Sequence, residues 1–273
     1  MHFLPSLSSS VIALVRAVIG AVFLIVVMLV KKSKIDFTAV KKNLILLIFS
    51  GAALGFNWIL LFESYRYTTV ATSTLCYYSA PAFVIIASPF ILKEKLSLKK
   101  VLCVIVSFIG MVFVSGVLQE SISLTELKGV LFGIAAAVLY ACIILLNKKM
   151  NNIPSADMTV CQLLVAAIVL LPYVILTGDL SKISLNLDVV VIIILLIIGI
   201  VHTGIAYALY FDCVKKVPAQ TVALFSYIDP VFAIILSATL LDEYFGMYSA
   251  LGAVLILGAS VFGELKIKKK PIM

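Results

Sequence analysis

The sequence predicts an all-α protein that crosses a membrane many times and is built from two inverted helical repeats. Three observations carry this prediction: an apolar composition, a series of apolar runs of spanning length, and loops that alternate between lysine-rich and lysine-poor. The chain has 273 residues, of which 63% are hydrophobic and 12% are charged. Soluble proteins are about 45–50% apolar and about 25% charged. The composition therefore excludes a disordered protein and argues against a water-soluble enzyme.

Nine apolar runs are long enough to cross the hydrocarbon core of a bilayer, which takes about 20 residues of helix. Short polar loops separate them and leave little chain for a soluble domain. The predicted spans are residues 10–30, 44–65, 70–92, 101–118, 129–147, 158–177, 189–211, 219–241 and 246–265.

The positive charges divide the loops into two alternating sets. Seventeen lysines fall on one side, in the loops at 31–43, 93–100, 148–157 and 212–218 and in the tail after residue 265. The other side has only Arg66, Lys128 and Lys182. Because positive loops stay in the cytoplasm, we expect a cell-membrane protein with a cytoplasmic C-terminus and, with nine spans, an external N-terminus. The same distribution explains the net charge of +8 without nucleic acid as a partner.

The chain aligns with itself at a separation of 149 residues without a gap. Tyr78 then meets Tyr227, Pro81 meets Pro230, and Glu94 meets Glu243. The charge assignment puts the two glutamates on opposite sides, so the two copies cross the membrane in opposite directions. Inverted repeats are typical of secondary transporters, which expose a midplane site to each side in turn. The predicted parts are a first repeat at 1–118, a second repeat at 129–265 and a basic cytoplasmic tail at 266–273.

Two stretches resemble the EamA-like family of the drug/metabolite transporter superfamily. They are Tyr78-Ser79-Ala80-Pro81-Ala82-Phe83 running to Leu92-Lys93-Glu94, and Tyr227-Ile228-Asp229-Pro230-Val231-Phe232 running to Leu241-Asp242-Glu243. The resemblance covers essentially the whole chain. It implies ten helices in two inverted sets of five, both termini in the cytoplasm, and transport of small metabolites.

The start of the chain departs from that pattern. The first run, with Arg16 in Leu14-Val15-Arg16-Ala17-Val18, resembles the second helix of the family, so the first helix of the first repeat is missing. Two explanations are open: a start assigned at an internal methionine, which we favour, or a natural truncation. A truncated chain would have an alternative function, as a non-transporting membrane subunit or receptor.

Two prolines lie near the centres of their spans. Pro81 and Pro230 each remove one backbone hydrogen bond and clash with the carbonyl four residues earlier. A freed carbonyl in lipid must face protein or a wet cavity. We expect a hinge or a substrate site at both prolines, and a kink that only improves packing is the alternative.

Two charges lie inside predicted spans. An acidic residue at the depth of Asp229 costs about 2.5–3.5 kcal/mol on insertion scales and is a functional candidate by default. Its three candidate roles are to bind a cationic group, to carry a coupling proton, or to pair with a fixed positive charge. Arg16 is the candidate charge partner. The alternative for Arg16 is a side chain that reaches the outer interface.

Polar and aromatic residues complete the predicted cavity. In the family resembled here, the helices that match 44–65, 70–92, 129–147, 189–211 and 219–241 surround the substrate. The residues on them that we expect to face a small organic substrate are Asn57, Trp58, Tyr78, Ser79, Tyr140, His202, Tyr207, Tyr227 and Asp229. A packing role is the alternative for each of them, and for His202 it is at least equally expected.

The sequence thus predicts a secondary transporter that moves a small organic metabolite by alternating access. It has no glycine-rich phosphate loop of the kind that binds ATP. An intramembrane enzyme would need a catalytic group of residues at depth, whereas Asp229 is the only mid-span acid and the only histidines are His2 and His202. The five cysteines have no metal-binding spacing, so we expect no metal and no cofactor. Substrate, direction, coupling proton or ion, and the existence of a homodimer stay open.

Overall fold

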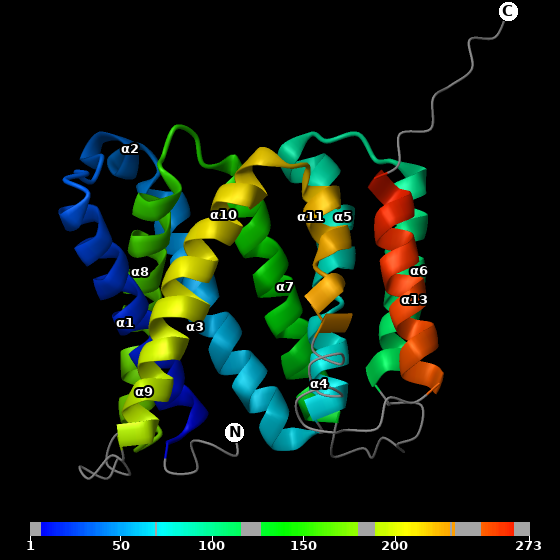
Figure 1. Cartoon of the computed structure of the whole chain (residues 1–273), viewed down its shortest axis with the longest axis horizontal. Helices are drawn as coiled ribbons and strands as arrows, with labels where there is room; N and C mark the ends of the chain where they lie inside the picture. Colours follow the sequence, from blue (N-terminus) through cyan, green and yellow to red (C-terminus); the bar gives the residue numbers. More distant parts are fainter. Residues whose placement is uncertain are drawn as a thin grey trace, which may run out of the picture.

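The computed structural model is a bundle of helices standing roughly parallel to one another (Figure 1). It describes residues 7–68, 70–115, 127–179, 189–229, 231–232 and 247–264. Every regular element in these ranges is a helix, which confirms the all-α class. The elements are α1 (Ser9–Val30), α2 (Phe37–Lys42), α3 (Leu44–Tyr67), α4 (Val70–Tyr77), α5 (Ala80–Leu92), α6 (Leu98–Ser115), α7 (Leu127–Lys149), α8 (Ser155–Leu176), α9 (Val189–Ile197), the π-helix η4 (Ile198–Ile205), α10 (Ala206–Lys216), α11 (Ala219–Phe225) and α13 (Met247–Glu264).

The predicted apolar runs coincide with these helices. The run at 70–92 is α4 followed by α5, and the run at 189–211 is α9, η4 and α10 in succession. Of the run at 219–241, the described residues include α11 and little more. Among the described residues, six spans are long and apolar enough to cross a membrane. Large apolar side chains cover their outer surface, such as Phe90 and Leu176, which are 83% and 86% exposed. An outer surface of this composition is suited to contact with lipid.

The buried side chains form two main hydrophobic cores. The first core lies among α1, α3 and α8, and the second lies among α5, α6, α11 and α13, while α7 contributes to both. Each core therefore combines helices from the two halves of the chain. Tyr140 and Tyr210 pack against both cores. The seam between the cores is the place where a central cavity can form.

Small residues let the helices approach closely at two crossings, one in the first core and one between α1 and η4. A Cβ added at Gly51 of α3 would lie 2.7 Å from Cβ of Val165 in α8. A Cβ added at Gly199 of η4 would lie 2.5 Å from Cγ2 of Ile19 in α1. Without a hydrophobic driving force between helices in lipid, close backbone approach of this kind provides much of the packing energy.

The predicted lysine-rich loops lie together at one end of the bundle, at the top of Figure 1. We call this the lysine-rich end: it contains α2, the loops α5–α6, α7–α8 and α10–α11, and the C-terminal end of α13. Proline residues fix the helix starts here, since Pro154 directly precedes α8 and Pro218 directly precedes α11. A proline there needs no backbone N–H partner and is already in a suitable conformation.

Candidate functional site

A cavity of about 190 Å³ lies at the seam between the two cores. Its walls come from α3, α4, α5, α7, α10 and the end of α11, so both halves of the chain contribute. Five of the eleven lining residues are tyrosines, and one is acidic. The lining residues are Leu54, Tyr77, Tyr78, Ala80, Pro81, Tyr140, Tyr207, Tyr210, Phe211, Ser226 and Asp229.

A break in the span at 70–92 places two of the tyrosines. α4 ends at Tyr77, and α5 begins at Ala80 with Pro81 in its first turn. Proline is well tolerated in a first turn, because the N–H that it lacks would have no helical partner there. The sequence predicts a hinge or a kink at Pro81. The structure has two separate helices here, and Ser79 Oγ between them donates to the carbonyl of Cys76 at 2.6 Å.

The second half has a corresponding break. α11 ends at Phe225, and Ser226 and Tyr227 form a turn before a short helical segment that contains Asp229. Ser226 Oγ donates to the carbonyl of Val222 at 2.9 Å, four residues back. Pro230 lies outside the described residues. The two breaks bring Tyr78 and Tyr227 face to face, with ring centroids 6.5 Å apart.

The tyrosines contact one another across the cavity. The ring centroids of Tyr77 and Tyr140 are 5.4 Å apart. The hydroxyl of Tyr140 donates to the hydroxyl of Tyr210 at 2.9 Å and so joins α7 to α10. Aromatic pairs at such distances contribute about 0.5–1.5 kcal/mol beyond the burial of their area. The result is a wall of ring faces with a few hydroxyl groups.

Asp229 is the only acidic residue that lines this cavity. The carboxylate has no hydrogen bond or ion pair to any of the described residues. In particular, no ion pair joins it to Arg16 there. Within the described part of the chain, this carboxylate is therefore open to a ligand cation or to a proton.

The guanidinium of Arg16 lies instead on the ring of Trp58, with Cζ 3.7 Å from the ring centroid. Trp58 in turn contacts Tyr207 of the cavity wall, at a centroid distance of 6.1 Å. A desolvated cation–π contact of this kind is worth about 2 kcal/mol or more. Arg16 Nε is buried and has no hydrogen-bond partner in the described part of the chain. The structure thus separates Arg16 from Asp229 by an aromatic layer.

Asn57 lies behind the cavity wall rather than in it. Its side chain is buried, and Nδ2 donates to the carbonyl of Ala136 in α7 at 2.6 Å. Its Oδ1 accepts from the hydroxyl of Tyr77 at 3.5 Å. Asn57 therefore joins α3 to α7 and orients a tyrosine that lines the cavity.

The structure brings together some of the residues that the sequence singles out and leaves others apart. Tyr78, Pro81, Tyr140, Tyr207 and Asp229 line the cavity, and Asn57, Trp58 and Tyr227 support its wall. His202 is exposed on η4 and is not among the lining residues, whereas its neighbours Thr203 and Gly204 are buried.

Sequence reasoning missed Tyr77, Tyr210, Phe211 and Ser226. Two signals point to the missed tyrosines: Tyr77 adjoins Tyr78, and Tyr210 follows Tyr207 by three residues, which places both on one helix face. No comparable sequence feature indicates that Phe211 or Ser226 lines the cavity, because apolar and small residues are common throughout these spans.

Hydrogen bonds close the bundle at the lysine-rich end. Both carboxylate oxygens of Glu94, just beyond α5, accept from the backbone N–H of Ala219, the first residue of α11, at 3.1 Å. Lys148 Nζ of α7 lies 3.7 Å from the same carboxylate. The side chain of Gln220 donates to the carbonyl of Lys95 at 2.9 Å and accepts from the N–H of Ser97 at 3.3 Å. We call these contacts the α5–α11 latch.

Comparison with known proteins gives consistent results. The sequence model of the EamA-like transporter family matches residues 2–116 and again 127–262. A Bacillus subtilis (strain 168) protein described as uncharacterized transporter YxxF is 31% identical over 218 residues, which cover 79% of this chain and 68% of that protein. Uncharacterized transporter YoaV of the same organism is 25% identical over 259 residues, covering 94% and 86%. A solved crystal structure with 17% identity matches with a TM-score of 0.85, covering 96% of this chain and 89% of the other, and supports the fold alone.

Proposed function

The chain belongs to the EamA-like transporter family, and from this membership and the central cavity we propose that it is a secondary transporter of a small organic metabolite. The observation that carries the proposal is the tyrosine-lined cavity, whose walls come from both halves of the chain and lie at a helix break. Binding sites of secondary transporters lie at the interface of repeats, next to discontinuous helices.

Alternating access is the mechanism that we infer for this site. The same family model matches two consecutive stretches of the chain, and the loop charges orient them in opposite directions. Two inverted copies supply two conformations of similar energy, one open to each side. With the α5–α11 latch formed, the lysine-rich end is the closed end. We assign that end to the cytoplasm of the cell, because it contains most of the lysines.

The wall chemistry favours a substrate with a protonated amine and an apolar or aromatic part. Tyrosine ring faces attract cations, and Asp229 supplies one negative charge without a fixed partner. The alternative role of Asp229, that of carrying a coupling proton, uses the same exposed carboxylate. The two roles are compatible if the substrate and the proton bind the Asp229 carboxylate alternately.

The proposal is tested by metabolite profiling of cells that lack or overproduce the protein. Wild-type protein is expected to change the ratio of internal to external concentration of a small set of metabolites, enriched in amines. Tyr210→Ala is expected to abolish the change, because it removes a wall residue and its bond to Tyr140. Tyr248→Ala, on an exposed tyrosine of α13, is the matched control and is expected to retain it.

Two outcomes would contradict the proposal. An identical metabolite profile with and without the protein would exclude transport under those conditions of growth. Saturable binding of an amine to purified protein, with no flux into vesicles, would favour the alternative of a membrane receptor or subunit.

A further inference from the structure

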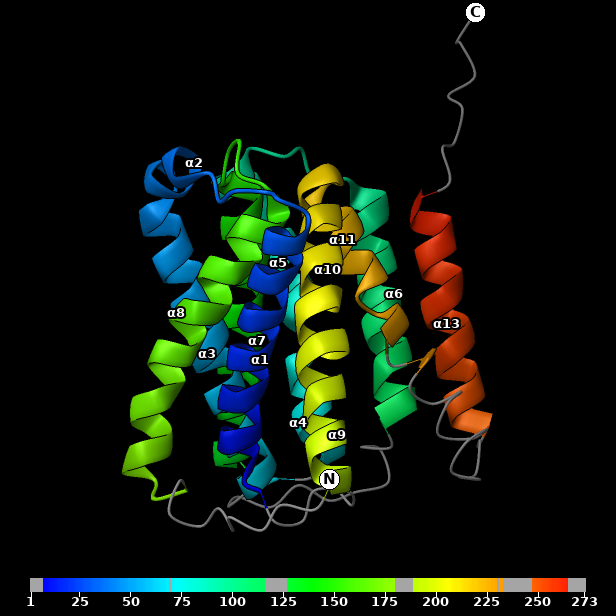
Figure 2. The same ribbon diagram turned by 60° about the vertical axis from the view of Figure 1, so that its left-hand side comes forward.

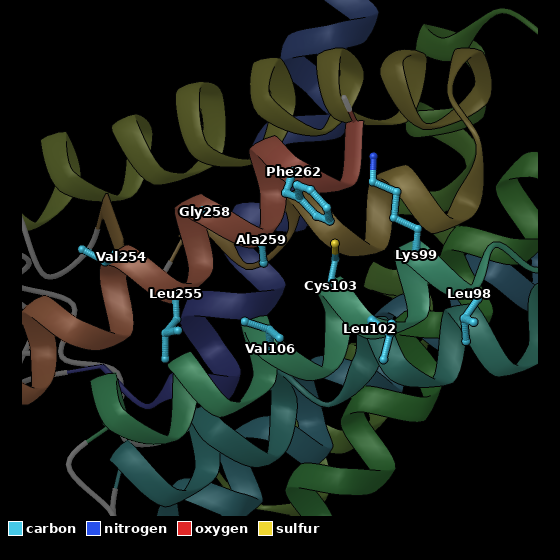
Figure 3. Close-up of a pocket in the computed structure, with 10 residues that line it drawn as sticks. All are labelled: Leu98, Lys99, Leu102, Cys103, Val106, Val254, Leu255, Gly258, Ala259 and Phe262. Atoms are coloured by element: carbon cyan, nitrogen blue, oxygen red, sulfur yellow. The ribbon is translucent and has the colours of Figure 1, made fainter. Parts of the chain in front are cut away.

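A second hollow lies far from the tyrosine cavity, on the outside of the bundle. α6 and α13 stand side by side at its edge (Figure 2), and a groove of about 580 Å³ lies between them (Figure 3). Ten residues line the groove, and Lys99 is the only charged one. The others are Leu98, Leu102, Cys103, Val106, Val254, Leu255, Gly258, Ala259 and Phe262.

The groove lies between two places where α6 and α13 approach each other. A Cβ added at Gly110 would lie 2.8 Å from the carbonyl oxygen of Gly252, and a Cβ added at Gly263 would lie 3.6 Å from Cβ of Cys103. Between these two contacts, a Cβ added at Gly258 would meet no atom within 4 Å, and this open space belongs to the groove. Buried Cys103 and Ala259 form the floor, and exposed leucine, valine and phenylalanine side chains form the walls.

One end of this apolar groove is positively charged. Lys99 lies in the first turn of α6, and its Nζ is 4.8 Å from the ring centroid of Phe262 (Figure 3). Lys93 and Lys95, both exposed, lie in the loop just before α6.

We propose that the groove binds one acyl chain of an anionic phospholipid, with the phosphate of the lipid at Lys99. On α6 the lining residues extend over the nine positions from Leu98 to Val106, or about 12 Å of helix. A groove of this length that starts at the membrane interface stays within a hydrocarbon core about 30 Å thick. Basic pockets between transmembrane helices on the cytoplasmic side suit anionic headgroups. This site is independent of the transport site and of its substrate.

Charge favours a lipid over a second copy of the chain. In a twofold dimer about an axis normal to the membrane, equivalent residues of the two copies lie at the same depth. Lys99 of each copy would then face the other across a low-dielectric groove, together with Lys93 and Lys95. An anionic lipid places an opposite charge at that position instead.

The test uses three variants and native mass spectrometry of the purified full chain. The probes are dioleoylphosphatidylglycerol, which is anionic, and dioleoylphosphatidylcholine, which is zwitterionic. Gly258→Leu fills the open space of the groove, Lys99→Gln removes the charge, and Val261→Leu alters an exposed position of the same helix outside the groove.

The wild type and Val261→Leu are expected to bind a first phosphatidylglycerol molecule several-fold more tightly than phosphatidylcholine. Lys99→Gln is expected to lose about fivefold of that preference, the effect of one lysine near a lipid surface. Gly258→Leu is expected to lose the first binding event for both lipids while remaining monodisperse on size exclusion.

Three results would overturn the proposal. The first is an unchanged first binding event in Gly258→Leu. The second is equal affinity of the wild type for the two lipids. The third is a dimer that Gly258→Leu dissociates, which would assign the groove to a second copy of the chain.

Discussion

Tyr207 lies between two groups of opposite charge, the guanidinium of Arg16 and the carboxylate of Asp229. On one side, Trp58 holds the guanidinium of Arg16 against its ring, and on the other side Asp229 faces the cavity. Arg16 is stabilised by the ring of Trp58. The carboxylate of Asp229 is therefore not needed to stabilise the charge of Arg16. This arrangement is consistent with the proposed role of Asp229 in binding a substrate amine or a proton.

Asp229→Asn is therefore expected to fold normally and to lose transport. The amide keeps the size and polarity of the side chain but can neither attract a cation nor release a proton. The measurement is the unfolding temperature in detergent together with flux in vesicles. Arg16→Gln is the comparison, and it is expected to lower the unfolding temperature, because it removes the cation–π contact with Trp58. A matching fall in stability for both variants would instead show that the two residues form a structural pair.

Among the helices, the α5–α11 latch links the end of α5 in the first half of the chain to the start of α11 in the second half. An acceptor at a helix N-terminus satisfies a backbone N–H that has no helical partner. Glu94 does this for α11 from a distant point in the sequence, and its charge also suits the positive end of the helix dipole.

Glu94→Ala is expected to weaken the closed state by about 1 kcal/mol, the usual value of a cap. This corresponds to a roughly fivefold shift of the equilibrium between closed and open states. The measurement is the rate at which an impermeant thiol reagent, applied from the lysine-rich side, modifies a cysteine placed at Ser226. Glu94→Gln, which retains an acceptor oxygen, is the matched control and is expected to give a smaller increase. Equal rates in wild type and Glu94→Ala would show that the latch does not control access.

The contact between α1 and η4 depends on a glycine. Gly199→Leu is expected to lower the free energy of unfolding by about 1–3 kcal/mol or more, the range typical of overpacking. Even the Cβ of the new side chain would lie 2.5 Å from Cγ2 of Ile19. The measurement is the yield of monodisperse protein and its unfolding temperature. Gly258→Leu makes the same chemical change in open space and is expected to leave both values unchanged. A tolerated Gly199→Leu would mean that α1 can move away from η4 at little cost.

At the scale of the whole molecule, the loop charges predict the orientation of both repeats. Single cysteines placed after Leu92 and after Leu241 are expected to react with an impermeant reagent from opposite sides of the membrane. The C-terminal tail is expected to share the side of the first of these cysteines, because both lie in lysine-rich segments. Reaction of both cysteines from the same side would rule out inverted repeats.

Much of the architecture could be predicted from the sequence, because in lipid each span must satisfy its own backbone hydrogen bonds as a helix. The run at 44–65 illustrates this, since it differs from α3 by two residues at one end. The division of 189–211 into α9, η4 and α10 could not be predicted. A π-helix is formed by backbone hydrogen bonds between residues five apart, and here Thr203 Oγ1 also donates to the carbonyl of Ile198 at 3.0 Å. An apolar pattern indicates neither kind of bond.

The cavity was less predictable than the spans. Tyr140 and Tyr207 were placed in it by span position and turned out to line it, whereas His202 has the same kind of position and is exposed. The position of a residue within a span indicates its depth in the membrane, but not whether its side chain is on the interior or the lipid face of the helix. When apolar side chains occupy both the lipid face and the interior face, hydrophobic periodicity does not distinguish them.

Under the proposed mechanism, the tyrosine-lined cavity opens to each side of the membrane in turn. This is tested most directly with a cysteine at Ser226, in a variant whose five native cysteines are replaced. The variant is treated with an impermeant thiol reagent in right-side-out and in inside-out vesicles. We expect modification from both sides, and protection on both sides by a transported amine. Modification from one side only, whether or not substrate is present, would contradict alternating access.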